Sequence, residues 1–330
     1  MSDNPQQLVM QIGIGYALSS VLHVATKLDI ADKLANGPKS TADLAKSSGV
    51  LEAPLYRALR ALASVGIFKE VGDRTFENTP ASDVLRTNHP QSLRKMAEFI
   101  CEPFHFRTYA ETLYSLQSGK PAGEKVAGMP LFEYFPKNPE LGELFNDAMT
   151  NFSASLVPAI LEAYDFSGIN TIVDVAGGHG MVVRSIVQKY PSMRGILFDM
   201  PHVIERAQRA DRLELIAGDF FKSVPSGGDA YVMKHIIHDW DDEHATMILK
   251  NIKTAMGGNA NARVLLFESV IKPGNDPDFA KILDIEMMLF PGGKERTDAE
   301  YAQLFAAAGF KLSRIVPTKS PLSVIEATPA

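Results

Sequence analysis

Twelve residues in the last third of the chain, Met233–His244, concentrate side chains that could do chemistry. Their sequence, MKHIIHDWDDEH, holds three histidines, four carboxylates and the only tryptophan of the chain. Histidines beside carboxylates can bind zinc or iron, and one histidine oriented by a carboxylate can act as a general base. Acidic residues before a helix can also be plain helix-start charges. The neighbouring segments have to distinguish these interpretations.

The expected elements separate the three histidines by position. His235 still belongs to a strand-like run, VMKHII, and His244 follows the acidic first turn of an expected helix. His238 lies at the corner between strand and helix, where side chains of a parallel sheet face the ligand crevice. A metal site would need two of these histidines to converge with Asp239 or Asp241 from one strand-to-helix transition. We therefore expect no metal, and interpret His235 as a packed histidine.

The second half of the chain alternates strand-like apolar runs with helix-length stretches. The runs are TIVDV, RGILFDM, LELIAGDF, DAYVMKHII and RVLLFESVI. This alternation predicts a parallel sheet with helices on both faces. Ligands of such sheets bind beyond the carboxyl ends of the strands, and the residues considered next lie at those ends.

The first strand runs into a glycine-rich loop, DVAGGHG, at residues 174–180. Glycines let the backbone approach a ligand, and the helix behind them offers free N–H groups. Gly178 and Gly180 fit the first two positions of the dinucleotide pattern G-x-G-x-x-G, but Val183 occupies the third. Asp174 would repel a pyrophosphate, yet it suits a ligand that carries an ammonium and a sulfonium. The loop therefore weakens a nicotinamide interpretation.

Aspartates also follow the next two strands. Asp199 ends the second strand nineteen residues after Gly180, where a carboxylate can accept both hydroxyls of a ribose. Asp219 closes the third strand, in a place suited to the amino group of an adenine. Each aspartate alone could be a loop cap, but three acids at consecutive strand ends favour a ligand site.

The first hundred residues predict helices followed by a hairpin. Apolar residues recur at helical spacing over residues 6–34, and the first helix is apolar nearly all round, so it needs a partner surface. Ser40 with Asp43 predicts a helix start, Gly66 can end a second helix, and two strand-like pieces, IFKEV and TFENT, follow. Helix, turn, helix and hairpin is the order of a winged helix.

A winged helix raises DNA binding as an alternative function. Residues 40–70 hold four basic and three acidic side chains, whereas contact with phosphates would need a basic stripe. The whole chain has a formal net charge of −6, which also argues against nucleic acid or anionic lipid as the main partner. We expect packing or dimerisation from this domain, and no nucleic-acid partner.

The composition bounds the remaining possibilities. The 330 residues are 45% hydrophobic and 22% charged, as in a globular protein of two domains. The single cysteine, Cys101, excludes an internal disulfide and a cysteine-built metal site. The N-terminus lacks the basic segment of a secretory signal, and we find no window near the ~20 apolar residues of a membrane span. We therefore expect a cytoplasmic protein without a membrane partner.

Residues 89–164 keep a helical pattern. The sequence NPE at residues 138–140 predicts a helix start. The helix that follows places Phe145, Met149 and Ser153 on one face. A plain core stripe would account for Phe145 and Met149 equally well.

Together these motifs resemble the class I S-adenosylmethionine-dependent O-methyltransferases of the caffeic acid, hydroxyindole and antibiotic-tailoring type. The resemblance spans nearly the whole chain and is carried by DVAGGHG, FDMPHVI, GDFF, HDWDDE and PGGKERT. It implies an α/β fold, in which a Rossmann-like methyltransferase domain at residues 165–330 follows an all-α winged-helix dimerisation domain at residues 1–100. A helical connecting and substrate-pocket segment at residues 101–164 joins them.

The resemblance also implies partners and residue roles. It implies S-adenosylmethionine as cofactor, S-adenosylhomocysteine as product, no metal, a small aromatic acceptor and a homodimer through the N-terminal helices. His238 would be the general base, oriented by Glu268 and Glu295. The implied cofactor shell is Ser153, Asp174, Gly177, Gly178, Gly180, Asp199, Met200, Asp219, Phe220 and Lys234. The implied acceptor pocket includes Phe145, Met149 and Asp239.

Two positions depart from the pattern of the family. Ala176 replaces the first glycine of the loop, a small change that should be tolerated. Phe290 precedes Pro291 where plant relatives often have a polar residue, so their acceptor preferences do not transfer to this chain.

The implied reaction needs alignment and the removal of one proton. Methyl transfer from a sulfonium is an in-line displacement whose thioether leaving group needs no acid, so positioning matters most. A phenol has a pKa of ~10 and histidine one of ~6.5, so a neutral imidazole can take the proton during attack, worth roughly 10²–10⁴ in rate. An acceptor carboxyl, with a pKa of ~4, would need no base. Carboxyl methylation, another cofactor-dependent reaction and a ligand-sensing regulator are therefore the alternatives.

Overall fold

The computed structural model describes residues 4–330, which form two compact units. The first unit runs to Phe106 and includes Pro139–Ser155, and the second comprises Arg107–Asn138 and Leu156–Ala330. Two helices, α7 (Pro103–Ala110) and α11 (Pro139–Ala163), contribute residues to both units. The predicted division at residues 1–100, 101–164 and 165–330 stays a prediction.

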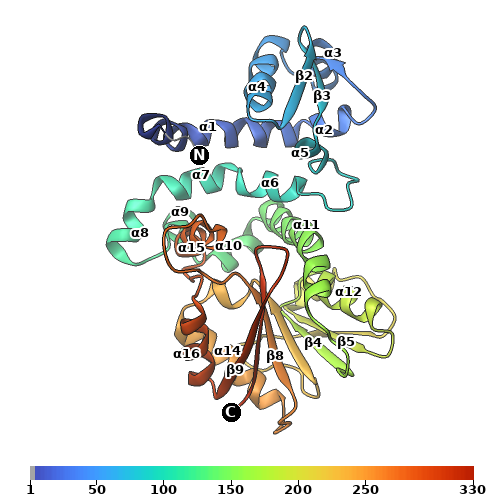
Figure 1. The fold of residues 1–330 in the computed structure, drawn as a ribbon, viewed down its shortest axis with the longest axis vertical. Helices are drawn as coiled ribbons and strands as arrows, with labels where there is room; N and C mark the ends of the chain where they lie inside the picture. Colours follow the sequence, from blue (N-terminus) through green and yellow to red (C-terminus); the bar gives the residue numbers. More distant parts are fainter. Residues whose placement is uncertain (1–3) are drawn as a thin grey trace. The chain divides into compact units, whose positions relative to one another are not determined.

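The first unit surrounds a three-stranded antiparallel sheet of order β1-β3-β2 with short helices (Figure 1). Besides its parts of α7 and α11, its elements are, in chain order, α1 (Pro5–Lys27), α2 (Ile30–Lys33), β1 (Lys39–Ser40), α3 (Thr41–Ser48), α4 (Glu52–Ser64), β2 (Phe68–Gly72), β3 (Thr75–Asn78), α5 (Pro80–Asp83) and α6 (Arg94–Ile100). Leu44, Leu59 and Phe76 are fully buried in its core. The order α3, α4, β2, β3 agrees with the predicted helices and hairpin.

Local signals account for the boundaries of α3 and α4. The Ser40 hydroxyl accepts the Asp43 N–H at 3.1 Å and so caps α3. Helix α4 ends at Ser64, shortly before Gly66, whose φ of +84° turns the chain. The NPE signal is confirmed for position only, because α11 begins at Pro139 without a side-chain cap. The Asn138 amide instead donates to the Tyr134 carbonyl at 3.0 Å.

Helix α1 presents apolar side chains that the described chain leaves uncovered. Val9, Met10, Ile12 and Tyr16 are each more than 60% exposed. The helix has one charged residue, Lys27, and by length and composition it could span a membrane. The expectation that no window approaches a membrane span was therefore wrong. One such helix is weak evidence for a span, since the core helix of a soluble protein and a signal sequence have the same length and composition.

The second unit is built on a seven-stranded sheet of order β6-β5-β4-β7-β8-β10-β9. The strands are β4 (Thr171–Val175), β5 (Arg194–Asp199), β6 (Leu213–Ala217), β7 (Ala230–Lys234), β8 (Arg263–Glu268), β9 (Phe310–Pro317) and β10 (Ser323–Pro329). The helices are α8 (Thr112–Ser118), α9 (Ala122–Ala127), α10 (Leu131–Lys137), α12 (Met181–Lys189), α13 (Pro201–Ile204), the 3₁₀ turn η1 (Ile237–Asp239), α14 (Asp242–Ala255), α15 (Phe279–Leu289) and α16 (Asp298–Ala307).

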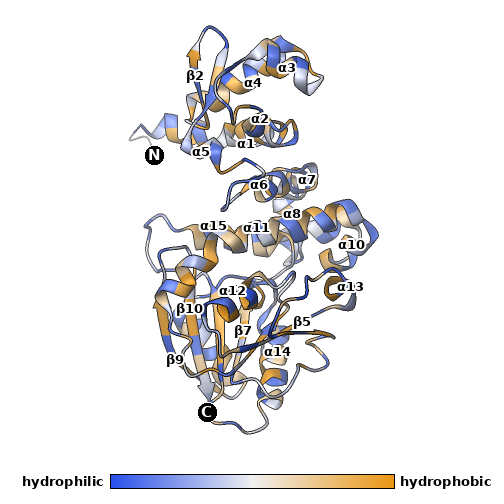
Figure 2. Ribbon diagram, turned by 90° about the vertical axis from the view of Figure 1, so that its right-hand side faces the viewer, coloured by the Kyte–Doolittle hydropathy of each residue, from blue (hydrophilic) through white to orange (hydrophobic). Residues whose placement is uncertain are grey.

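The five predicted strands are the five parallel strands of this sheet. Alternate side chains face opposite sides: Val173 and Ile196 pack against α14 and α16, whereas Gly195 meets Val183 of α12 on the other face. Figure 2 shows hydrophobic residues concentrated in central strands such as β7. We did not predict the last hairpin, in which β10 lies antiparallel between β8 and β9.

Candidate active site

The loop after β4 is shaped by its glycines, and Gly177 leaves no room for a side chain. A Cβ on Gly177 would lie 2.5 Å from the Asp174 carboxyl carbon and from Leu197, so the loop folds tightly over the strand ends. Gly178 has a φ of +59°, and a Cβ there would meet nothing within 4 Å, so its backbone borders open space. The predicted approach of backbone to a ligand is sterically possible at Gly178.

Ala176 adopts a left-handed conformation, with a φ of +57°. This conformation costs a residue with a Cβ roughly 1–2 kcal/mol, part of which glycine would lose again through its greater unfolded-state entropy. We expect Ala176→Gly to raise the melting temperature by about 2 °C, from a gain of about 1 kcal/mol, with activity retained. Thermal unfolding of both proteins measures this, and a lower melting temperature in the glycine variant would contradict it.

Asp199 connects the end of β5 to the glycine loop. One carboxylate oxygen accepts the Gly178 N–H at 2.8 Å, and the other accepts the Met200 N–H at 2.7 Å. Burial raises the pKa of Asp199, and these two N–H groups oppose the increase. Each oxygen keeps a further lone pair for a ligand. Asp219, after β6, accepts the Phe221 N–H at 2.9 Å, so the loop-cap interpretation holds for one of its oxygens.

Asp174 is buried and Lys234 is half-buried at the carboxyl ends of the neighbouring strands β4 and β7. Burial raises the pKa of Asp174 to about 7, although its carboxylate accepts the Val183 N–H at 3.2 Å. Burial also lowers the pKa of Lys234 to about 8, against the attraction of Glu268, Asp174 and Asp239. Both groups therefore change charge close to neutral pH, which is common in binding and catalytic sites.

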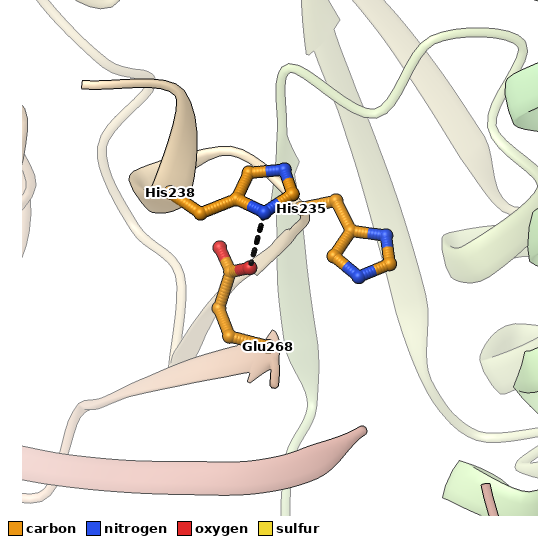
Figure 3. A group of neighbouring side chains, drawn as sticks. All are labelled: His235, His238 and Glu268. Atoms are coloured by element: carbon orange, nitrogen blue, oxygen red, sulfur yellow. Dashed lines mark ion pairs between the residues drawn. The ribbon is translucent and has the colours of Figure 1, made fainter. Parts of the chain in front are cut away.

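His238 is held in η1 with its ring 6% exposed. Its Nδ1 lies 2.5 Å from Oε1 of Glu295 and 3.7 Å from Oε2 of Glu268, the ion pair dashed in Figure 3. With Glu295 ionised, Nδ1 carries the proton and donates it, which leaves the Nε2 lone pair as the base. Nε2 lies 3.5 Å from Oδ1 of Asp239. The predicted trio of His238, Glu268 and Glu295 is thus brought together from three distant segments.

The two glutamates have different surroundings. Oε1 of Glu268 accepts the N–H groups of Ile236 and Ile237, both at 3.0 Å, so this side chain fixes the backbone before His238. Burial, together with the negative charge of Asp284, raises the pKa of Glu295 to about 8. The Glu295 carboxyl therefore changes charge close to neutral pH.

The ring of His235 lies beside that of His238, as Figure 3 shows. The ring centroids are 4.7 Å apart and the planes differ by 10°. His235, His238 and Glu268 each offer one atom within 4.8 Å of the others, so a metal site deserves consideration here. The Lys234 ammonium, 3.3 Å from Nδ1 of His235, would repel a cation.

The remaining residues of MKHIIHDWDDEH pack or cap. Trp240 stacks on Phe132 at 5.7 Å and meets Phe220 edge-on at 6.0 Å, as expected of a packing residue. Asp241 accepts the His244 N–H at 2.8 Å and caps α14, which confirms the helix-start interpretation. Met200, by contrast, is 45% exposed after β5.

Three predicted residues belong to the first unit. Phe145, Met149 and Ser153 lie on α11, where Phe145 packs against Phe99 at 5.5 Å. The Ser153 hydroxyl donates to the Met149 carbonyl at 2.7 Å and is buried. Their assignment to the cofactor shell and acceptor pocket stays a prediction.

The sequence motifs did not reveal the residues that contact the backbone of the turn around His238. Gly293, Lys294 and Arg296 surround the backbone of this turn, although only Glu295 of their motif, GGKERT, was singled out. A charged residue next to Glu295 in a glycine-flanked motif was the available signal. These contacts join residues more than fifty positions apart, so local patterns do not reveal them.

Two family models match the chain. The O-methyltransferase domain matches residues 109–311, and the O-methyltransferase dimerisation domain matches residues 10–88. A phenazine O-methyltransferase of Lysobacter antibioticus is 39% identical over 329 residues, which cover 98% of this chain and 96% of that protein.

Solved structures are similar along the whole chain. The LaPhzM crystal structure is 38% identical and covers 99% of this chain and 100% of its own, with a TM-score of 0.94. CalO1, a methyltransferase of calicheamicin biosynthesis solved in its SAH-bound form, is 31% identical, covers 100% of both chains and has a TM-score of 0.88.

Proposed function

The chain belongs to the O-methyltransferase family, and from this premise we propose that it methylates a hydroxyl of an aromatic small molecule, with His238 as general base. The methyl donor of this family is S-adenosylmethionine, and a phenolic hydroxyl fits the chemistry best. The observation that carries the proposal is the 2.5 Å contact between Nδ1 of His238 and Glu295, which leaves Nε2 to accept a proton.

The residues at the carboxyl ends of β4, β5 and β6 fit S-adenosylmethionine. Open space beside Gly178 and free lone pairs on Asp199 suit a ribose, while buried Asp174 suits an ammonium. In this proposal Asp199 accepts the ribose hydroxyls and Asp219 the adenine amino group. The remaining proposed shell is Ser153, Gly177, Gly180, Met200, Phe220 and Lys234.

The proposed mechanism assigns the protein two tasks, alignment and proton removal. The cofactor supplies an activated methyl group whose leaving group needs no acid. Nε2 of His238 takes the proton of the acceptor hydroxyl as its oxygen attacks, and the Glu295 carboxylate stabilises the imidazolium. Glu268 holds the preceding backbone, so that the ring is oriented before the acceptor binds. Phe145, Met149 and Asp239 are the proposed acceptor contacts.

The proposed working form is a homodimer through the N-terminal helices. Residues 10–88 match the dimerisation domain, and α1 within that range exposes Ile12, Ile14 and Tyr16. A second copy would cover these side chains, which removes the need for a membrane. A cytoplasmic location and the absence of a nucleic-acid partner stay predictions.

A panel of acceptors tests the proposed function. The purified enzyme is incubated with radiolabelled S-adenosylmethionine and with phenols, hydroxyquinones, hydroxyphenazines, aromatic amines and aromatic carboxylic acids. We expect labelled ether products from one or more hydroxylated compounds. Label found only in esters or amines would overturn the assignment to a hydroxyl acceptor.

Cofactor affinity should depend on pH through Asp174. Its carboxyl has a pKa of about 7, and only the ionised form attracts the ligand's ammonium, so binding strengthens as pH rises through 7. We expect the Kd of S-adenosylhomocysteine to be about tenfold higher at pH 6 than at pH 7.5. Calorimetry at both pH values measures it. Asp174→Asn should remove the dependence, and an equally strong dependence in that variant would contradict the assignment.

Chelation should leave turnover unchanged. The nearby Lys234 ammonium disfavours a cation shared by the two histidines, and proton removal by His238 needs none. Initial rates with and without EDTA on an accepted phenol check this. A rate that collapses with EDTA and returns with a single divalent ion would contradict the proposed mechanism.

A further inference from the structure

We propose that Arg296 is a positioning residue for His238, because its guanidinium binds the carbonyl groups on both sides of that histidine. This inference rests on the proposed function, in which His238 is the base. The side-chain hydrogen bonds of Arg296 in the described chain go to Ile237, Trp240, Asp242 and Lys294, none of which belongs to the proposed cofactor shell or acceptor residues. It would position the ring through the backbone carbonyls that flank His238.

The guanidinium of Arg296 donates hydrogen bonds to two backbone carbonyls of the turn that carries His238. Nη1 donates to the Ile237 carbonyl at 3.1 Å, and Nη2 donates to the Trp240 carbonyl at 2.9 Å. These carbonyls lie one residue before and two residues after His238. A planar guanidinium can hold two such acceptors in a fixed relation, which a lysine ammonium cannot reproduce.

The three residues before Arg296 also contact His238 or its backbone. A Cβ on Gly293 would lie 2.0 Å from the His238 carbonyl oxygen, so only glycine lets the two backbones approach. The Lys294 N–H donates to the same carbonyl at 2.9 Å. The Glu295 side chain then reaches the ring. Four consecutive residues, 293–296, therefore contact this turn. Of these four, Arg296 alone donates to carbonyls both before and after His238.

The burial of Arg296 indicates a specific role. Its side chain is fully buried, although an ion of this kind is costly to bury unless each donor has a partner. The one carboxylate partner is Asp242, which accepts from Nε at 3.1 Å and Nη2 at 2.9 Å and is itself 60% exposed. A core position that needed volume alone would be filled by an apolar side chain at lower cost.

The charge of Arg296 has a second, separable effect. It lowers the pKa of Glu295, which burial and Asp284 raise. Because base function needs Glu295 ionised, kcat should rise with pH through the ionisation of Glu295. The charged or titratable groups that face Glu295 are His238, Asp239, Glu268, Asp278, Asp284, Arg296 and Tyr301.

Two substitutions separate the effect of the two carbonyl hydrogen bonds from the effect of the positive charge. Arg296→Lys keeps the charge but cannot bind both carbonyls at once, so we expect kcat about 10- to 100-fold lower with an unchanged pH profile. Arg296→Met loses both, so the rise of kcat with pH should also move to higher pH. The Kd of S-adenosylhomocysteine should stay within twofold in each variant. Rates are divided by the number of S-adenosylhomocysteine sites, so that unfolded protein does not count.

Arg212→Lys is a matched control. The Arg212 guanidinium also binds backbone carbonyls, those of Val187, Tyr190 and Met193, at 3.0–3.3 Å. It lies at the amino ends of the strands, away from η1. We expect lower stability and an unchanged kcat per site. An equal fall of kcat in Arg212→Lys and Arg296→Lys would mean that general destabilisation is the cause and would overturn the proposal.

A spectroscopic measurement avoids dependence on the acceptor. The short Nδ1–H bond to Glu295 should give a proton NMR signal far downfield of ordinary imidazole N–H signals, assigned by its absence in His238→Gln. We expect this signal to shift or broaden in Arg296→Lys and to persist in Arg212→Lys. An unchanged signal and wild-type kcat per site in Arg296→Lys would overturn the inference alone. Wild-type kcat in His238→Ala would instead overturn the proposed function, and this inference with it.

Discussion

Replacing His238 with alanine should lower kcat by about 10²–10⁴-fold on a phenolic acceptor while cofactor affinity stays within threefold. The factor is that of general base catalysis by a positioned side chain. Binding should persist because the proposed cofactor contacts come from Asp174, Asp199 and Asp219 at other strand ends. Stopped-assay rates and calorimetry with S-adenosylhomocysteine measure the two effects on the same preparation.

Glu295→Gln is the matched control for this experiment. The amide keeps the size of the side chain and can still contact Nδ1, but it cannot stabilise an imidazolium as a carboxylate does. We expect a loss of about 10- to 100-fold, smaller than that of His238→Ala. Full activity of His238→Ala on the true acceptor would remove the base from the mechanism. It would favour an acceptor that is already ionised, such as a carboxylate.

The sequence predicts the parallel part of the fold because that information is local. Each of the five parallel strands is a short apolar run, all but β6 are followed by a helix before the next strand, and the DVAGGHG loop follows the first of them. The N-cap of α3 is equally local, since Ser40 and Asp43 are three residues apart. The final hairpin escaped prediction, because its strands are recognised through pairing with β8 rather than through their own pattern.

The chemistry of the site was predicted less completely, because it also depends on contacts between residues far apart in the sequence. His238 could be separated from His235 and His244 by its position at a strand end. Its proton partner Glu295 came from a family resemblance, because 57 residues separate the two side chains in the sequence. The pKa shifts of Asp174 and Lys234 depend on burial by the folded chain, which no sequence motif encodes. Arg296 was missed although it is adjacent to a predicted residue.

The left-handed residues show where local and global demands disagree. Ala176 and His235 both have positive φ, at +57° and +53°, and neither is a glycine. Ala176 opens the loop proposed to bind the cofactor, and His235 ends β7 beside the proposed base. Such backbone strain persists when the surrounding structure determines it, and it is frequent at functional sites. Both positions agree with a site at the carboxyl end of the sheet.

Asp199→Ala should abolish measurable cofactor binding at micromolar concentrations. The substitution removes the acceptor proposed for both ribose hydroxyls, and hydrogen bonds to charged groups contribute about 1.5–3 kcal/mol each. It also leaves the N–H groups of Gly178 and Met200 without their carboxylate, so the loop loses its attachment to β5. The combined loss corresponds to a Kd at least about 100-fold higher. Calorimetry with S-adenosylhomocysteine measures it.

Asp219→Ala is the comparison that gives this result its meaning. Asp219 has one oxygen bound to the Phe221 N–H and would contact a single amino group, so its loss should weaken binding by about tenfold. Asp199→Asn should fall between the two, because the amide keeps one acceptor oxygen. A Kd for Asp199→Ala within threefold of the wild-type value would contradict the assignment of the ribose to β5. The cofactor site would then have to be sought elsewhere on the sheet.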